Sequence, residues 1–184
     1  REKGSRVFGI DAVNEFDDLT DDIYDYCEVL KIGVDTLIHE SGPSQIEINL
    51  NHGDPLQLAD QAFMFKRAVR QVALKHGIHA TFMSKPYQGH PGSSMHIHQN
   101  IISKKTNKNL FSDENGNNTE EFFHFIGGLQ TYLPDAMLFF APYVNSYRRF
   151  VIDASAPINT HWGFENRTVA FRIPTSKGDS RRIE

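Results

Sequence analysis

A long amphipathic helix is the strongest structural constraint in this 184-residue sequence. Asp54-Pro55 is a typical helix start, because an N-cap acid and a proline at the first helical position both suit the free N–H groups there. Gly77 follows as a stop signal. Between them, apolar residues recur at spacings of four and three, at Leu58, Ala62, Phe65, Val69 and Val72. The pattern predicts a helix over 54–77 that buries one face.

The remaining elements follow one another without a regular βαβ order. We expect a helix over 18–31 with Asp17 or Thr20 as its N-cap, and an exposed hairpin or loop over 104–118. Further helices are expected over 120–132 and 134–140, the second opened by Pro134, and strands over 44–50, 78–83, 94–101 and 169–174. This order predicts an α+β fold with a largely antiparallel sheet flanked by helices.

Composition excludes several classes of protein. The net charge of −4 gives no sign of a nucleic-acid or membrane surface, and no apolar run approaches the length of a membrane span. The single cysteine, Cys27, excludes an intramolecular disulfide and favours a reducing, cytoplasmic location. We therefore expect no nucleic-acid partner and no membrane partner.

Both ends of the sequence are polar and carry no terminal signal. The chain opens on Arg1 rather than methionine and stops at Arg181-Arg182-Ile183-Glu184 without a capping signal. We expect a fragment of a longer protein.

A histidine pair gives the first indication of chemistry. In an extended segment, Ser94, His96, His98 and Asn100 share one face, and Met95, Ile97 and Ile101 share the other. A polar face with two imidazoles, backed by an apolar face, is typical of the wall of a metal site. Polar alternation on an ordinary surface strand is the alternative.

Two acids offer oxygen ligands elsewhere in the chain. Glu40 and Glu47 flank the turn-prone stretch Ser41-Gly42-Pro43-Ser44-Gln45, so a hairpin would let them converge on one hard cation such as Mg²⁺ or Mn²⁺. Two exposed acids at strand ends are the alternative.

Arginines complete the set of candidate groups. They are Arg148, Arg149, Arg167, Arg172, Arg181 and Arg182. Guanidinium groups bind carboxylates and phosphates bidentately, although a solvated surface position is the alternative for each of them. The chain has neither a Walker-type loop nor a Gly-x-Gly-x-x-Gly motif. Phosphate binding would therefore depend on metal and arginine.

In combination these residues resemble the glutamine synthetase family from about Gly9 to Glu184. The motifs, in order, are Glu40…Gln45-Ile46-Glu47-Ile48, Lys85-Pro86, Gly92-Ser93-Ser94-Met95-His96-Ile97-His98, Asn109-Leu110-Phe111, Gly127-Gly128, Asn145-Ser146-Tyr147-Arg148-Arg149, Asn166-Arg167…Arg172-Ile173-Pro174 and Arg181-Arg182-Ile183-Glu184. Each motif is weak alone, but their order is specific. The resemblance implies that 1–184 is part of the family's catalytic domain, with a curved sheet, and that the N-terminal β-grasp domain and a C-terminal remainder lie outside the chain.

The resemblance also implies a reaction and its residues. ATP activates the γ-carboxylate of glutamate as γ-glutamyl phosphate, and an amine then displaces phosphate, with two or more Mg²⁺ or Mn²⁺ ions in each site. By position, it implies metal binding by Glu40 and Glu47 on the glutamate side and by His96 and Glu184 on the ATP side, glutamate binding by Gly92 and Arg149, nucleotide binding by His98, Asn100 and Lys177, and phosphoryl stabilisation by Arg167 and Arg172. Stacked rings of identical subunits are implied as well.

Three departures bear on the amine acceptor. Pro91 replaces the family's usual asparagine before the glycine of the substrate loop, and a one-residue length difference leaves the place of Lys177 open. Ser155 occupies the position of the acid that binds ammonium, with Asp153 the nearest acid. The stretches 47–55 and 153–163 look more like the γ-glutamylpolyamine synthetase branch.

We therefore expect a glutamate–amine ligase whose acceptor is a polyamine or another alkyl amine. The isolated 184 residues are expected to be inactive, because part of the site lies outside them. A glutamine synthetase that uses ammonia and a non-catalytic scaffold with the same fold are the alternatives.

Overall fold

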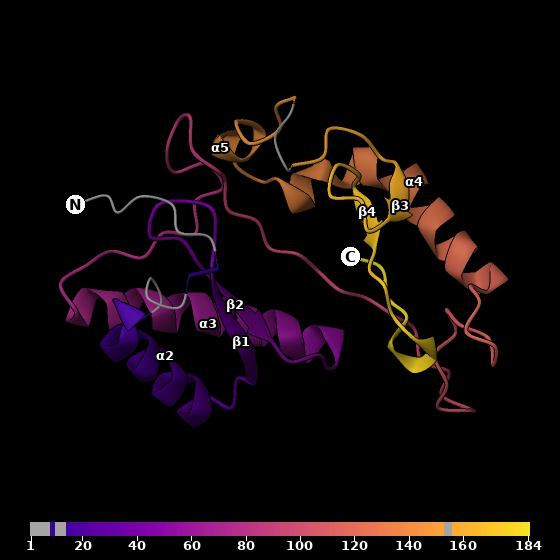
Figure 1. Cartoon of the computed structure of the whole chain (residues 1–184), viewed down its shortest axis with the longest axis horizontal. Helices are drawn as coiled ribbons and strands as arrows, with labels where there is room; N and C mark the ends of the chain where they lie inside the picture. Colours follow the sequence, from indigo (N-terminus) through magenta and orange to yellow (C-terminus); the bar gives the residue numbers. More distant parts are fainter. Residues whose placement is uncertain (1–7, 10–13, 153–155) are drawn as a thin grey trace. The chain divides into compact units, whose positions relative to one another are not determined.

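The computed structural model describes residues 8–9, 14–152 and 156–184 (Figure 1). The chain forms two compact units. The first comprises Arg1–Phe82 and Pro86–Pro91, and the second comprises Met83–Lys85 and Gly92–Glu184. Each unit has a hydrophobic core of its own. The α+β class expected from the sequence is confirmed. Within the described residues, no helix is both long and apolar enough to span a membrane.

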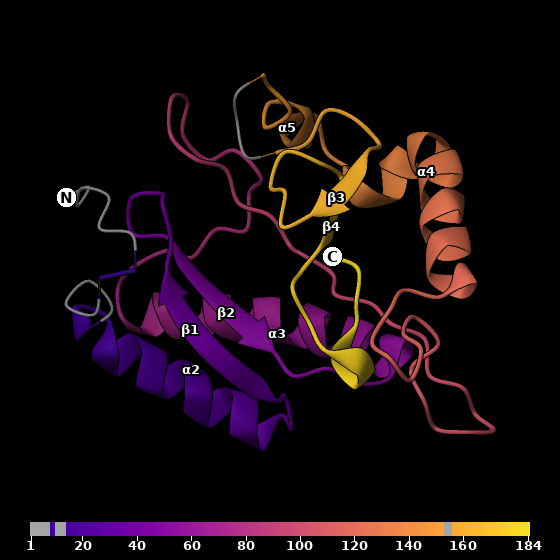
Figure 2. The ribbon, with the colours of Figure 1, turned by 45° about the vertical axis from the view of Figure 1, so that its right-hand side comes forward.

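The first unit pairs a β-hairpin with two helices. Strands β1 (Val34–His39) and β2 (Ile46–Leu50) are antiparallel, with a register irregularity between Val34 and Leu37. Helices α2 (Asp17–Val29) and α3 (Pro55–Lys75) lie along this hairpin (Figure 2). Apolar residues of the hairpin, including Val34, Ile48 and Leu50, pack against the core between the helices.

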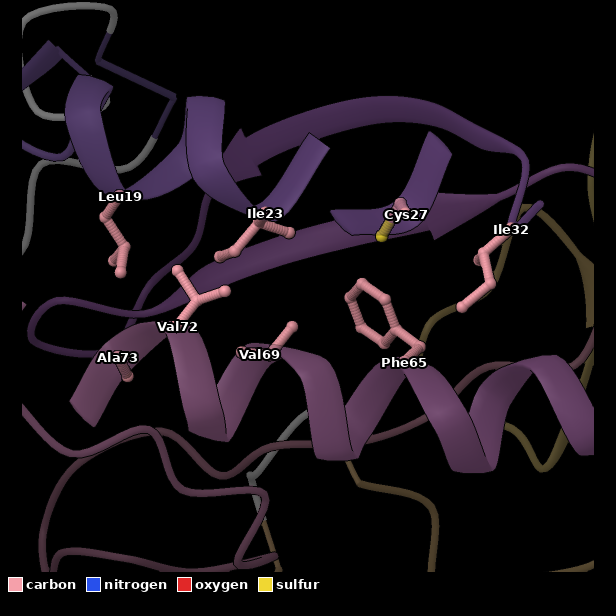
Figure 3. Close-up of a cluster of buried hydrophobic side chains, with 8 residues drawn as sticks. All are labelled: Leu19, Ile23, Cys27, Ile32, Phe65, Val69, Val72 and Ala73. Atoms are coloured by element: carbon pink, nitrogen blue, oxygen red, sulfur yellow. The ribbon is translucent and has the colours of Figure 1, made fainter. Parts of the chain in front are cut away.

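The core of the first unit confirms the predicted stripe of α3. Figure 3 shows side chains of α2 and α3 that point toward one another, and Ile32 closes the cluster. The buried members are Leu19, Ile23, Cys27, Ile32, Phe65, Val69, Val72 and Ala73. The Asp54 carboxylate accepts hydrogen bonds from the amides of Leu56 and Gln57 at 3.0 and 3.1 Å, so the predicted N-cap of α3 is confirmed.

The predicted N-cap of α2 is wrong. Phe16 occupies the N-cap position, with no capping hydrogen bond from a side chain. Thr20 lies inside the helix, where its hydroxyl donates to the Asp17 carbonyl at 3.0 Å. Burial of Leu19, Ile23 and Cys27 sets the start of this helix, because packing of an apolar face contributes more than a cap.

The second unit joins one long helix to a small parallel sheet. It contains α4 (Glu120–Phe140), α5 (Val144–Tyr147), β3 (Trp162–Phe164), β4 (Phe171–Ile173) and the 3₁₀ turn η1 (Gly178–Ser180). β3 and β4 pair in parallel, with Gly163 opposite Arg172. Phe122 and Ile126 of α4 share a core with Phe171 and Ile173 of β4. Ile183 belongs to the same core, so this packing also holds the segment next to Glu184.

Three local predictions are corrected by the structure. Helix α4 runs through Pro134 as one helix, so the proline costs a backbone hydrogen bond without ending the helix, although the buried residues Phe122 and Ile126 lie upstream of it. Residues 78–83 form no strand, although Ala80 and Phe82 pack against the first core. Residues 94–101 form no strand either, apart from an isolated bridge between Gln99 and Ile183. Alternation of apolar and polar residues shows which side chains share a face, but a strand also needs a neighbouring strand with which its backbone can pair.

Candidate functional site

Backbone pairing brings three distant segments of the second unit together. Gln99 and Ile183 exchange hydrogen bonds of 2.8 and 3.0 Å, and Arg172 and Glu184 exchange two of 2.8 Å. The segment that ends at Glu184 therefore lies between the histidine segment and β4. This pairing places the Glu184 side chain beside groups from both neighbours.

Glu184 is the centre of a polar cluster. Its side chain is only 5% exposed. One carboxylate oxygen, Oε1, lies 3.2 Å from Nδ1 of His96, and the other, Oε2, lies 3.8 Å from Nε2 of His98. Arg172 donates from its guanidinium to Oε2 as well. A buried carboxylate needs such partners, and these cationic or donor groups surround it.

His96 and His98 both reach Glu184, as expected for residues that share a face. Met95 and Ile97 are 60% and 49% exposed, however, so the predicted apolar backing of this face is absent within the described residues. The alternation placed the two imidazoles correctly, but it gave no information about burial of the other face.

The hydrogen bonds of His98 indicate its tautomer. Nε of Arg182 donates to Nδ1 of His98 at 3.1 Å, so Nδ1 carries no proton and the proton lies on Nε2, toward Glu184. Burial lowers the pKa of the His98 imidazole; Glu184 opposes this effect, while Arg182 and Arg172 add to it. His98 is therefore a neutral imidazole near pH 7.

His96 and Glu184 have the chemistry of a divalent-cation site. Neighbouring ligands of an octahedral Mg²⁺ ion lie about 3 Å apart, and the 3.2 Å between Nδ1 of His96 and Oε1 of Glu184 fits that spacing. Nε2 of His96 lies 3.1 Å from the Ser94 hydroxyl, which can orient the ring. Among the described residues, no group of three or more His, Cys, Asp or Glu side chains could hold a metal ion. These two residues alone therefore make half a coordination shell at most.

Arg172 lies between two carboxylates. Besides Glu184, its guanidinium lies 3.6 Å from Oε2 of Glu165. The amide of Thr175 donates to the Glu165 carboxylate, and this hydrogen bond lowers the pKa of that carboxyl. Two fixed carboxylates hold one guanidinium in a defined place, which suits a group that must meet negative charge.

Gly92 and Arg149 lie in close contact. A Cβ at Gly92 would lie 2.7 Å from the Ser84 carbonyl oxygen and 2.8 Å from both Cγ and Cδ of Arg149, so only glycine fits here. Arg149 is partly buried, and burial lowers the pKa of its guanidinium. The two residues that the family resemblance assigns to glutamate are thus neighbours.

Glu40 and Glu47 lie on the hairpin of the first unit. Ile38 opposes Glu47, and the amide of Glu40 donates to the Gln45 carbonyl at 2.8 Å, so the antiparallel pairing continues through Glu40. Glu40 and Ile38 share a face, and Glu40 is therefore a diagonal neighbour of Glu47. Because such neighbours have Cβ atoms about 7 Å apart, both carboxylates can approach one cation.

The other predicted site residues show no such convergence. Arg167 lies in the loop between β3 and β4, Asn100 follows the Gln99 bridge, and Lys177 precedes η1; all three side chains are exposed. Asp153 and Ser155 lie outside the described residues. The structure therefore brings together His96, His98, Arg172 and Glu184 in one place, and Gly92 and Arg149 in another.

Sequence reasoning assigned no role to four residues that support these groups. Arg182 contacts His98, Glu165 contacts Arg172, Ser94 contacts His96, and Asn145 bonds the backbone of Lys85. Ser94, Asn145 and Arg182 lie inside motifs that carry the family resemblance, and this position in a motif could have marked them as candidates. The partners of Arg182 and Asn145, however, lie 84 and 60 residues away in the sequence.

A family model describes the whole chain. The catalytic domain of glutamine synthetase matches residues 1–184. Gamma-glutamylputrescine synthetase PuuA of Escherichia coli strain K12 is 41% identical to the chain over 187 aligned residues, covering 100% of this chain and 39% of the relative. The glutamine synthetase of Pyrococcus horikoshii is 37% identical over 177 residues, covering 96% of this chain and 39% of that protein.

Solved structures show the same likeness. The apo form of GmaS superimposes with a TM-score of 0.84 at 31% identity, covering 98% of this chain and 42% of that one. A complex of GmaS with ADP gives a TM-score of 0.85 at 30% identity. The chain thus spans about two fifths of the length of the relatives that it matches.

Proposed function

Because this chain belongs to the glutamine synthetase family, we propose that it forms part of the catalytic domain of a longer, ATP-dependent glutamate–amine ligase. One observation carries the proposal: the buried Glu184 carboxylate meets His96 and Arg172. His96 and Glu184 are side chains of the kind that bind metal ions, and the Arg172 guanidinium is a cation suited to binding phosphate. The match of the family model over 1–184 supports the same assignment.

The proposed reaction has two steps. An oxygen of the glutamate γ-carboxylate attacks the γ-phosphorus of ATP, ADP leaves, and γ-glutamyl phosphate forms. The nitrogen of an amine then attacks the γ-carbonyl carbon, phosphate leaves, and the nitrogen loses a proton to give an amide. Both steps develop negative charge on phosphate oxygens, which cationic groups stabilise.

The residues proposed for the reaction divide this work. A divalent cation held by His96 and Glu184 would neutralise phosphate charge when bound, and Glu40 and Glu47 would hold a cation for the glutamate side. Arg172, fixed between Glu165 and Glu184, stabilises the phosphoryl group in transfer, together with Arg167. Neutral His98, whose Nδ1 accepts from Arg182, can donate a hydrogen bond from Nε2 at the nucleotide, with Asn100 and Lys177 as further nucleotide contacts.

The glutamate site is proposed at Gly92 and Arg149. The Arg149 guanidinium is partly buried, and loss of hydration strengthens its attraction to a carboxylate. The close approach of Gly92 leaves the loop backbone beside the arginine. A substrate such as glutamate can pair a carboxylate with the Arg149 guanidinium and place its amino group at the backbone of the Gly92 loop.

We assign a polyamine or another alkyl amine as the acceptor. The likeness to gamma-glutamylputrescine synthetase supports this choice, as does Ser155 at the position where the family's ammonium users carry an acid. Ammonia is the second candidate, because the archaeal relatives are named glutamine synthetases.

Phosphate release from the full-length protein separates the two acceptors. With ATP, glutamate and Mg²⁺ or Mn²⁺, we expect faster release with putrescine than with ammonia, and mass spectrometry should detect the γ-glutamyl amide. Equal or faster turnover with ammonia would favour a glutamine synthetase instead.

A charge-removing variant tests the ligase assignment itself. Arg172→Gln should lower kcat by about 100-fold, because it removes a guanidinium aimed at developing charge. Lys108→Gln is the matched control, since Lys108 pairs with Glu114 at an exposed position 2.8 Å away and should leave turnover unchanged. A scaffold without activity would show neither amine-dependent phosphate release nor Mn²⁺-dependent nucleotide binding by calorimetry.

Assembly and location remain predictions. We propose a ring-shaped homo-oligomer from the family likeness, and a cytoplasmic location from the single Cys27. Size-exclusion chromatography with light scattering checks the assembly, and fractionation of cells checks the location.

A further inference from the structure

The carboxamide of Asn145 bonds both backbone polar groups of one residue, Lys85. Its Oδ1 accepts from the amide of Lys85 at 2.8 Å, and its Nδ2 donates to the carbonyl of Lys85 at 3.0 Å. Sixty residues separate the partners in sequence. Asn145 lies in α5, which ends two residues before Arg149. The side chain thus connects the helical turn that precedes Arg149 to the backbone of Lys85.

Ser84, the residue before Lys85, extends this connection toward the glutamate loop. Its hydroxyl lies 3.3 Å from the hydroxyl of Ser146, which is buried, and its carbonyl accepts from the amide of Ser93 at 2.9 Å. The same carbonyl oxygen lies against Gly92. A continuous set of contacts therefore runs from Asn145 through Lys85 and Ser84 to Gly92.

We propose that Asn145 is a positioning residue that fixes the spacing between the Gly92 loop and Arg149. This inference rests on the proposed binding of glutamate at those two elements. Asn145 holds both from one side: it belongs to the turn that presents Arg149, and it anchors the backbone against which Gly92 packs. The carboxamide suits this role, because only a group with adjacent donor and acceptor atoms satisfies both polar atoms of one residue's backbone.

The proposal predicts a selective defect in glutamate use. Asn145→Ala in the full-length protein removes both hydrogen bonds, so the Gly92 loop can move away from Arg149. The KM for glutamate should rise about tenfold, as expected for the loss of one to two hydrogen bonds in positioning. The KM for ATP should change by less than about twofold, because the groups around Glu184 are not bonded through Asn145.

Amide hydrogen exchange tests the contact between Asn145 and Lys85 independently of enzyme turnover. The amide of Lys85 and the amide of Ser93 should exchange about tenfold faster in Asn145→Ala than in the wild type. Peptides that cover 84–93 report this change. Asn117→Ala is the matched control: its carboxamide bonds Asp113 within an exposed turn, and its loss should alter neither the exchange of 84–93 nor the KM for glutamate.

The outcomes separate this role from the proposed function. A wild-type protein without glutamate-dependent phosphate release overturns the proposed function and this role with it. An active wild type, with an unchanged glutamate KM in Asn145→Ala, overturns the positioning role alone. If the alanine variant does not fold, Asn145→Asp decides, since it keeps the acceptor for the Lys85 amide but loses the donor. Its glutamate KM should lie between those of the wild type and about ten times that value, and a wild-type KM overturns the proposal.

Discussion

Gly92→Ala is the most direct test of the proposed glutamate site. The backbone at Gly92 has an ordinary conformation for any residue, so the cost of alanine is steric alone. The new Cβ would lie 2.7 Å from the Ser84 carbonyl oxygen, which is 0.7 Å below the 3.4 Å where ordinary contact begins. It would also lie 2.8 Å from two carbons of the Arg149 stem, which is 0.6 Å too close.

The loop must therefore move relative to Arg149. The Ser84 oxygen is backbone and is bonded to Ser93, so it gives way less easily than the Arg149 side chain. Overpacking of this size costs about 1–3 kcal/mol in stability. A misplacement approaching 1 Å lowers catalysis by up to about 100-fold. We expect kcat/KM for glutamate to fall about 10- to 100-fold, with the KM for ATP changed much less.

The assay is amine-dependent phosphate release by the full-length protein, with glutamate and ATP varied separately. Gly127→Ala is the matched control, because its Cβ would meet nothing within 4 Å on an exposed turn of α4. That variant should keep its kinetics and gain about 0.5–1 kcal/mol in stability, as alanine favours helix. A Gly92→Ala protein with wild-type kcat/KM for glutamate would refute the reasoning.

Three further predictions concern the two cores and one cap. Burial raises the pKa of the Cys27 thiol above its ordinary 9.0, so the folded chain keeps a proton that the unfolded chain loses. This contribution to stability is fully present below pH 9.0 and is lost as the pH rises toward the raised value, a slope that urea unfolding at several pH values should show and that Cys27→Ala should flatten. Asp54→Ala removes the N-cap of α3 and should cost about 1 kcal/mol by urea unfolding; no change would mean that water replaces the cap. Ile126→Ala empties a position that is 1% exposed in the second core and should cost about 2–5 kcal/mol, whereas a loss below about 1 kcal/mol would show that the core collapses around the gap.

Local sequence patterns predicted the elements whose signals are themselves local. The stripe from Leu58 to Val72 and the cap at Asp54 both describe α3 as observed. Alternation over 44–50 likewise predicted β2. These features depend on neighbours within a few residues, where backbone geometry alone decides which side chains share a face.

Predictions failed where a distant partner decides the outcome. The segment 78–83 has an alternating pattern but forms no strand, and α4 continues through Pro134, where the sequence predicted the start of a separate helix. Alternation put His96 and His98 on one face, and the family resemblance paired His96 with Glu184. The contact of Arg182 with His98 was not foreseen from either source.

The sequence by itself determined the α+β class, the amphipathic helices and membership of the glutamine synthetase family. Each of these is encoded in the spacing or order of residues along the chain. Only the tertiary structure decided which groups hold the candidate site in shape: Glu165 and Glu184 on Arg172, and Asn145 on Lys85. Such contacts arise where backbone pairing and core packing bring separate segments together, and periodicity along the chain carries no record of that choice.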